Sequence, residues 1–143
     1  MIVESILIEK GTDVVTTTPE ASVWSAANWL RVKDIGALVV MDREETVGLI
    51  GEREIVRAFC EFGESVGSKS VKDVMTRRLI TVAPDDNVTH VMKLMTRHRV
   101  RHTPVLRNRK LVGIVSIGDV VKHRLQELEL ELHVMRDAYV AGR

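Results

Sequence analysis

The sequence predicts a mixed fold of helices and strands, built from two copies of one small unit packed face to face. Two observations support this. A short apolar run that leads into a helix start occurs twice, and its landmarks share one offset, since Gly48 and Gly113 are 65 residues apart, as are Pro19 and Pro84. This period is too long for a solenoid repeat. One such unit is too small to bury an adequate core, so the two copies should pack together.

Residues 110–121 contain the more informative of the two runs. Residues 111–115 are apolar and β-branched around Gly113, which predicts a buried strand. Ser116 and Asp119 follow, and their oxygens suit the cap of a helix. Free amides and a hydroxyl at a helix N-terminus can bind phosphate, and a carboxylate can bind a sugar diol. The stretch therefore fits either a site for a phosphorylated ribose or an ordinary capped turn.

Composition narrows the class of protein. The chain has 143 residues, of which 45% are apolar and 29% charged, as is typical of one compact domain. No run approaches the ~18 apolar residues of a membrane helix, and no signal peptide is evident, so we expect a cytoplasmic protein that does not enter the membrane. The one cysteine, Cys60, excludes an intrachain disulfide and is expected to be a buried thiol.

The net charge of +1 conceals a difference between the two halves of the chain. Residues 1–70 carry 7 basic and 12 acidic side chains, whereas residues 71–143 carry 14 basic and 8 acidic ones. The second half is therefore expected to attract anions more strongly than the first.

The first copy is expected at residues 1–62, before a linker rich in Gly and Ser at 63–70. Its predicted strands are 13–17, 37–41 and 47–50, and its predicted helices are 3–9, a second starting at Thr18–Pro19, and 52–62. The second helix should bury one apolar face, flanked by two packing tryptophans: Val23, Ala26, Ala27 and Leu30, with Trp24 and Trp29. The third should turn four apolar residues inward: Ile55, Val56, Phe59 and Phe62.

The second copy is expected at residues 71–126, with strands at 79–82, 103–106 and 111–115. A helix at 85–98 should bury Val88, Val91, Met92 and Met95. The last helix opens at Asp119 and continues into a helical extension at 127–143. Its apolar residues are spaced as a heptad seam: Val121, Leu125, Leu128, Leu132, Met135 and Tyr139. The seam predicts a homodimer, and the alternative is a helix that folds back on its own body.

The duplication, the order of elements and the two glycine-containing runs together resemble a tandem pair of CBS domains, also called a Bateman module. The segments RHTPVL and KLVGIVSIGDVV are similar to the second repeat of that family, and IGALVV and VGLIGEREIV are similar to the first. The resemblance covers residues 3–126 and implies an α+β fold with two clefts related by a pseudo-two-fold axis. It also implies a stand-alone bacterial or archaeal regulatory protein that binds AMP, ADP, ATP or a dinucleotide such as NAD, requires no cofactor and is not an enzyme.

The matching positions of the second repeat supply one expected nucleotide site. By the resemblance, Asp119 binds the ribose hydroxyls, Ser116 lies near the phosphate and Ile114 forms an apolar wall against the base. The other expected members edge the adenine pocket or line the base and phosphate: Thr81, Val100, Arg101 and His102.

The first repeat departs from the family pattern, so a weaker or empty site is expected there. Gly51 stands in place of the hydroxyl residue, and Glu54 in place of the aspartate. The other equivalent positions include an acid where a phosphate would lie: Thr16, Asp34, Ile35 and Leu49. Losing a hydroxyl contact to a charged phosphate costs about 1.5–3 kcal/mol.

Two further clusters point to other chemistries. A basic run could contact nucleic acid, although stacking aromatics are absent nearby: Arg97, His98, Arg99, Arg101, His102, Arg107, Arg109 and Lys110. The five histidines lack the thiols or clustered carboxylates that would complete a metal site, and no Walker-type loop is present. The resemblance to CBS-domain pairs therefore remains the basis of the functional prediction, and it implies an energy-sensing module that regulates an unidentified partner protein. The alternative is a structural or nucleic-acid-binding adaptor with a vestigial cleft.

Overall fold

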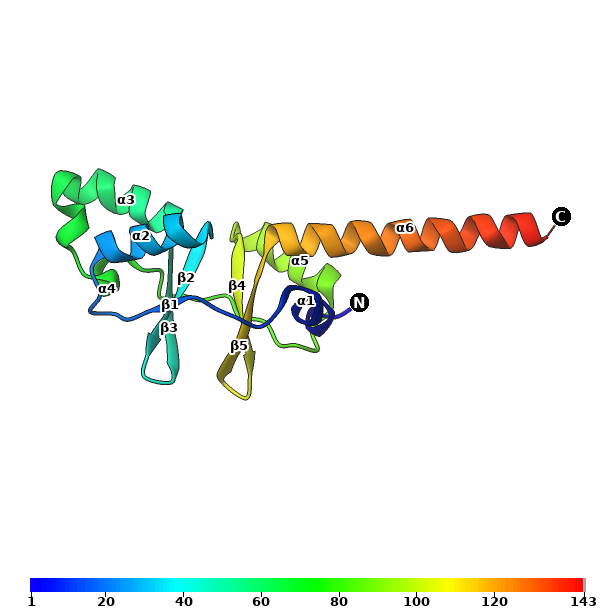
Figure 1. The fold of residues 1–143 in the computed structure, drawn as a ribbon, viewed down its shortest axis with the longest axis horizontal. Helices are drawn as coiled ribbons and strands as arrows, with labels where there is room; N and C mark the ends of the chain where they lie inside the picture. Colours follow the sequence, from blue (N-terminus) through cyan, green and yellow to red (C-terminus); the bar gives the residue numbers. More distant parts are fainter. Residues whose placement is uncertain (143) are drawn as a thin grey trace.

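A computed structural model describes residues 1–142 and confirms an α+β fold of two similar halves (Figure 1). The first half contains α1 (Val3–Lys10), β1 (Thr16–Thr17), α2 (Val23–Lys33), β2 (Ala37–Asp42), β3 (Glu45–Gly51) and α3 (Glu52–Phe62). A 3-10 helix, η1 (Gly63–Ser68), and the short α4 (Val71–Val74) lead to the second half. That half contains α5 (Val88–His98), β4 (His102–Arg107), β5 (Lys110–Ser116) and α6 (Ile117–Ala141).

Each half is built around an antiparallel hairpin, β2–β3 or β4–β5, in the same register. The hairpins stand side by side, with contacts between β3 and β5 (Figure 1). In the first half β1 adds a third, parallel strand, but it is shorter than the predicted strand at 13–17. In the second half the strand predicted at 79–82 is reduced to a single parallel bridge between Val82 and Val105.

The lead-in helices are exchanged between the two halves. α1 begins the chain but packs its buried side chains, Val3, Ile6 and Leu7, into the core of the second half. α4 instead packs into the core of the first half through Val71. Equivalent backbone bonds dock both helices, because the amide of Glu4 donates to the carbonyl of Pro84 at 2.8 Å and the amide of Lys72 to that of Pro19 at 2.9 Å. Each core is therefore completed by a segment from across the junction.

The helices α2 and α5 begin later than predicted, because polar side chains cap them at an inner position. Ser22 Oγ accepts the amide of Ser25 at 3.1 Å, so α2 begins at Val23 and the start predicted at Thr18 is wrong. Asn87 Oδ1 accepts the amide of Thr89 at 2.8 Å and caps α5 in the same way.

The helix α2 buries Val23, Ala26 and Leu30, as its apolar spacing predicts. The prediction that Trp24 and Trp29 are packing residues is wrong, because their side chains are 66% and 45% exposed. Neither tryptophan belongs to the first core, which is filled by aliphatic side chains and Met75.

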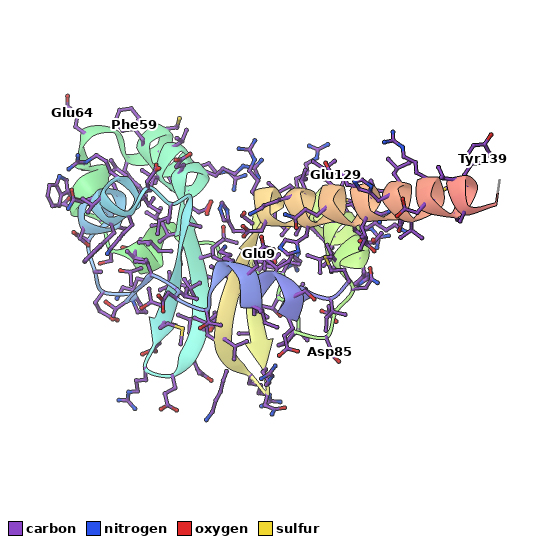
Figure 2. The ribbon with its side chains drawn as sticks, turned by 45° about the vertical axis from the view of Figure 1, so that its right-hand side comes forward. Glu9, Phe59, Glu64, Asp85, Glu129 and Tyr139 are labelled. Carbon is purple, nitrogen blue, oxygen red and sulfur yellow. The ribbon has the colours of Figure 1, made fainter. Side chains whose placement is uncertain are left out.

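The helix α3 is also less buried than predicted, since Ala58 is its one fully buried side chain. Ile55 is half-buried, but Val56 and Phe59 are exposed, and Phe59 projects from the outer side of α3 (Figure 2). Cys60 is exposed as well, so the expectation of a buried thiol is wrong.

The last helix, α6, runs far beyond the body of the molecule (Figures 1 and 2). Its base is attached to α1, because the two carboxylate oxygens of Glu9 lie 3.4 Å from Lys122 Nζ and 2.9 Å from His123 Nε2. The seam residues are exposed, and the helix does not fold back on the body, so that alternative is wrong. Among the helices of residues 1–142, none has the length and apolar character that a membrane crossing requires.

We expect Ile6→Ala to destabilise the protein by about 2–5 kcal/mol, because Ile6 is fully buried in the core of the opposite half and its loss leaves a cavity. Ile8→Ala on the same helix is the matched control, since Ile8 is 80% exposed and should change the free energy of unfolding by less than about 0.5 kcal/mol. Urea unfolding measures both. Equal effects would show that α1 does not complete the second core.

Candidate functional site

Two clefts lie where the halves meet, and each is lined by residues of both halves. The larger, here called the Glu54 cleft, has a volume of about 370 Å³. One wall is the end of β3 and the start of α3, including Leu49 and Glu54. The opposite wall comes from the second half, between α4 and the Val82 bridge and at the turn from α5 into β4, and includes Ile80 and Val100.

The smaller, here called the Asp119 cleft, has a volume of about 280 Å³. Ile114 and Ser116, at the end of β5, line one side, and residues 10, 13–15 and 34–37 of the first half line the other. Asp119 lies at the edge of this cleft, because its Oδ2 is 2.9 Å from the Ser116 amide nitrogen and 2.6 Å from Lys10 Nζ.

The Asp119 cleft keeps part of the predicted second-repeat site and replaces the rest. Ile114, Ser116 and Asp119 are together, as predicted. Across from them lie Asp34 and Ile35, two residues predicted for the other site. The predicted grouping by repeat is therefore wrong, because the helix start of one half faces the helix-to-strand turn of the other.

The Glu54 cleft shows the same exchange. Leu49 and Glu54 come from the predicted first-repeat site, but Val100 and Arg101, predicted for the second, lie across from them. Two predicted members line neither cleft and are exposed: Thr16 and Thr81.

The start of α6 is held by a reciprocal pair of hydrogen bonds. Ser116 Oγ accepts the Asp119 amide at 3.1 Å, and Asp119 Oδ2 accepts the Ser116 amide at 2.9 Å. Lys10 Nζ donates to the same Oδ2 and to the Ile114 carbonyl at 3.0 Å. Burial opposes ionisation of Asp119, but the bonds from Lys10 and Ser116 outweigh it and hold the pKa of this carboxyl below its ordinary value of 3.8. Asp119 is therefore charged and already engaged within the chain.

The start of α3 has no hydroxyl cap, and the backbone explains why. A Cβ added to Gly51 would lie 2.4 Å from the carbonyl oxygen of Gly36, so a larger residue would force the two backbones apart. Burial raises the pKa of Glu54, and the charge of Arg57 and the amide of Gly51 offset part of this. The departure of Gly51 from the family pattern thus follows from a close approach of two chain segments.

His102 lines both clefts. A Cβ on Gly36 would lie 2.7 Å from its Cε1, so the glycine allows the imidazole to lie against the turn before β2. Burial lowers the pKa of His102, and the charge of Lys10 adds to this effect, so the ring is neutral near pH 7.

Within residues 1–142, no group of three or more His, Cys, Asp or Glu side chains is placed to hold a metal ion.

The positive charges gather in the Glu54 cleft. Five arginines line it, from both halves: Arg53, Arg57, Arg78, Arg99 and Arg101. The guanidinium of Arg53 donates to the carbonyl of Arg99 and so joins α3 to the turn before β4. Because a guanidinium can bind a phosphate with two parallel hydrogen bonds, the cleft predicted to be weak or empty has the richer set of phosphate-binding groups.

Sequence reasoning missed several charged lining residues, among them Lys10, Asp13, Glu52, Arg57 and Arg78. Lys10 ends α1, and Arg78 follows α4, so both reach their clefts through the exchanged lead-in segments. The repeat offset relates Arg78 to Asp13, 65 residues earlier, and would have located either residue once the other had been identified. The sequence contained no comparable signal for Lys10.

We expect Lys10→Met to raise the pKa of Asp119, because it removes a hydrogen bond and a positive charge from the carboxylate. A depressed carboxyl pKa contributes stability above the unfolded pKa, and that stability is lost as the pH falls through the folded pKa. The variant should therefore lose less stability than the wild type on acidification below about pH 4. NMR titration of the Asp119 carboxyl carbon measures the pKa directly.

Lys122→Met is the matched control, since Lys122 pairs with Glu9 on the same pair of helices and not with Asp119. An unchanged Asp119 pKa in Lys10→Met would mean that the bond between Lys10 and Asp119 is not formed in solution.

Comparison with known proteins adds independent information about this architecture. The family model described as CBS domain matches residues 3–61 and 71–126. The mitochondrial CBS domain-containing protein CBSX3 of Arabidopsis thaliana is 38% identical over 130 residues, and the match covers 87% of this chain and 63% of the plant protein. The chain therefore spans less than two thirds of that relative.

Two solved structures are also similar. The CBS-domain containing protein ATU1752 from Agrobacterium tumefaciens is 39% identical with a TM-score of 0.84, and the match covers 87% of this chain and 99% of that one. The CBS domain pair of MJ0100, solved with 5-methylthioadenosine and S-adenosyl-L-methionine, is 27% identical with a TM-score of 0.78 and is covered over 98% of its length, against 89% of this chain. With two tandem matches and two interlocked halves, this chain belongs to the CBS-domain family and carries a CBS-domain pair.

Proposed function

We propose that this chain is a regulatory module that binds an adenine nucleotide in the clefts between its CBS repeats. The observation that supports this most strongly is the Glu54 cleft, where five arginines surround an apolar slot. The sequence favoured the second-repeat motif as the main site. We propose instead that the phosphates bind in the Glu54 cleft, because the arginines are there and the Asp119 carboxylate is paired with Lys10.

The Glu54 cleft offers a complementary group for each part of a nucleotide. Leu49, Ile80 and Val100 supply an apolar slot for a purine. Glu54 supplies a carboxylate for the ribose diol, and its raised pKa reflects a partly buried position that a sugar hydroxyl can share. The arginines supply the charge for phosphate. The adenosine compounds bound by the related MJ0100 pair support an adenosine-type ligand.

A nucleic-acid adaptor is the alternative, and the structure weakens its main support. The basic run around residue 100 is divided, because His98, Arg99 and Arg101 turn into the Glu54 cleft. Arg107 is paired with Glu4 at 3.0 Å. A continuous basic surface for a phosphate backbone is therefore not formed by this run.

We expect ATP, and more weakly AMP, to stabilise the protein in a thermal-shift assay, by about 2.7 kcal/mol at a hundredfold excess over the dissociation constant. Arg101→Ala should weaken ATP binding by about tenfold, because it removes one charged contact to phosphate. Arg97→Ala is the matched control, since Arg97 is exposed on α5 and does not line the cleft. Calorimetry measures the affinities. Binding of RNA without any binding of nucleotides would favour the adaptor.

We also propose that two copies of this chain associate through α6. Its seam residues are exposed along a helix that projects from the body, and a single exposed apolar seam of this length is costly in water. The seam is shorter than three heptads, so contacts between the bodies must add to it.

We expect Leu128→Glu/Leu132→Glu to shift the protein from dimer to monomer in sedimentation equilibrium, because the charges would lie in the paired seam. Leu130→Glu/Val134→Glu is the matched control, since these two residues are also exposed but lie on the opposite face of the helix. A wild-type monomer at micromolar concentration would contradict the proposal.

A further inference from the structure

The two clefts have matching apolar walls. Their lining residues pair at the 65-residue offset: Val15 with Ile80, Ile35 with Val100, and Leu49 with Ile114. One member of each pair lines the Asp119 cleft and the other lines the Glu54 cleft. Because the apolar walls are alike in residue type, the same flat heterocycle suits both.

At two pairs of equivalent positions that line the clefts, the charges are opposite in sign. Asp13 lines the Asp119 cleft, and its equivalent 65 residues later, Arg78, lines the Glu54 cleft. Asp34 and Arg99 form a second such pair. At a third pair of positions, Gly36 corresponds to Arg101. The pseudo-symmetry thus relates two aspartates of the Asp119 cleft to two arginines of the Glu54 cleft, and it relates Gly36, which lines both clefts, to a third arginine.

The backbone does not require this reversal. Asp34 and Arg99 are the residues that end α2 and α5, and both adopt the left-handed conformation, with φ of 50° and 54°. An aspartate is among the residue types that this conformation tolerates well, but an arginine gains nothing from it. The Arg99 carbonyl is held by Arg53, which fixes the turn that carries its guanidinium. The charge at this position is therefore explained by the cleft that it faces.

The remaining charges strengthen the contrast. In the Glu54 cleft five arginines face two glutamates, Glu52 and Glu54. In the Asp119 cleft the cation is Lys10, and it is bound to Asp119 at 2.6 Å, so Asp13 and Asp34 are not offset. His102 faces both clefts and is kept neutral by burial. A phosphate entering the Asp119 cleft would meet carboxylates, whereas in the Glu54 cleft it would meet guanidinium groups.

We propose that the two clefts sort adenosine ligands by the charge of the 5′ substituent, with Asp13/Arg78 and Asp34/Arg99 as the residues that determine specificity. The Glu54 cleft takes an adenosine with a 5′ polyphosphate. The Asp119 cleft takes an adenosine without phosphate, whose 5′ group is neutral or positive. This inference rests on the proposed function for the identity of the base and sugar, and adds which ligand class each cleft accepts.

The test is a titration of the full chain with three probes: ATP, S-adenosylmethionine, whose 5′ sulfonium is positive, and inorganic tripolyphosphate. Calorimetry gives the affinity and the number of sites. The backbone amide signals of Gly51 and Ser116, one in each cleft, report by NMR where each probe binds. ATP and tripolyphosphate should shift Gly51 and leave Ser116 unchanged, and S-adenosylmethionine should shift Ser116.

Two double variants exchange the charges. Arg78→Asp/Arg99→Asp should weaken ATP binding at Gly51 by at least about tenfold, and Asp13→Arg/Asp34→Arg should create a second ATP site that shifts Ser116. Asp13→Asn/Asp34→Asn controls for loss of the acids alone and should weaken S-adenosylmethionine without recruiting ATP. Arg97→Asp controls for the change in overall charge, since Arg97 is outside both clefts. Circular dichroism checks folding, and the single variants Arg99→Asp and Asp34→Arg replace any double variant that does not fold.

The outcomes separate the two proposals. ATP shifting Gly51 and Ser116 at equal concentration in the wild type, or an ATP affinity of the Asp119 cleft unchanged by Asp13→Arg/Asp34→Arg, would overturn the sorting and leave the proposed function intact. Tripolyphosphate binding at Gly51 with no binding of either adenosine compound would instead overturn the proposed function, while supporting the charge difference between the clefts.

Discussion

The exchange of the lead-in helices is the constraint on which the rest of the structure depends. α1 fills the core of the second half and ends at Lys10, which reaches Asp119. α4 fills the core of the first half, and the chain that follows it carries Arg78 into the Glu54 cleft. Neither half completes its core or its cleft from its own residues. A ligand that fills either cleft would therefore contact both halves.

The start of α3 lacks the hydroxyl cap that the start of α6 has. A close approach of two backbone segments explains this difference better than the loss of a binding motif does. At the start of α6, Ser116 and Asp119 bond to each other and form a rigid cap. At the start of α3, the carbonyl of Gly36 occupies the space that a side chain on Gly51 would need. The second arrangement gives up a hydroxyl but places Glu54 opposite the arginines of the other half. A motif judged weak by its residue types thus belongs to the more basic cleft.

The sequence predicted the features that depend on local pattern. The 65-residue offset and the short apolar runs located both hairpins, and the spacing of Val88, Val91 and Met95 located the buried face of α5. The sequence did not predict the features that depend on how the two halves dock against each other. Trp24 has an apolar side chain but faces solvent, and Arg101 lies beside the second-repeat motif in sequence yet lines the other cleft. One wall of each cleft could be predicted, because its residues are close together in the sequence. The other wall could not, because the packing of the two halves places it.

Asp119 lies at the edge of the smaller cleft and also belongs to the projecting helix α6. Asp119 lies in the first turn of α6, and its partner Lys10 is the last residue of α1. The residue before it on α1, Glu9, contacts Lys122 and His123, which lie one turn further along α6. Two neighbouring sets of polar contacts therefore hold the end of α1 to the base of α6. Ion pairs that are partly exposed contribute little free energy individually, so a ligand group that replaces Lys10 at Asp119 can exchange one partner for another at low cost. The base of α6, a 25-residue helix whose far end projects from the body, is therefore held in part by Lys10, a residue of the Asp119 cleft.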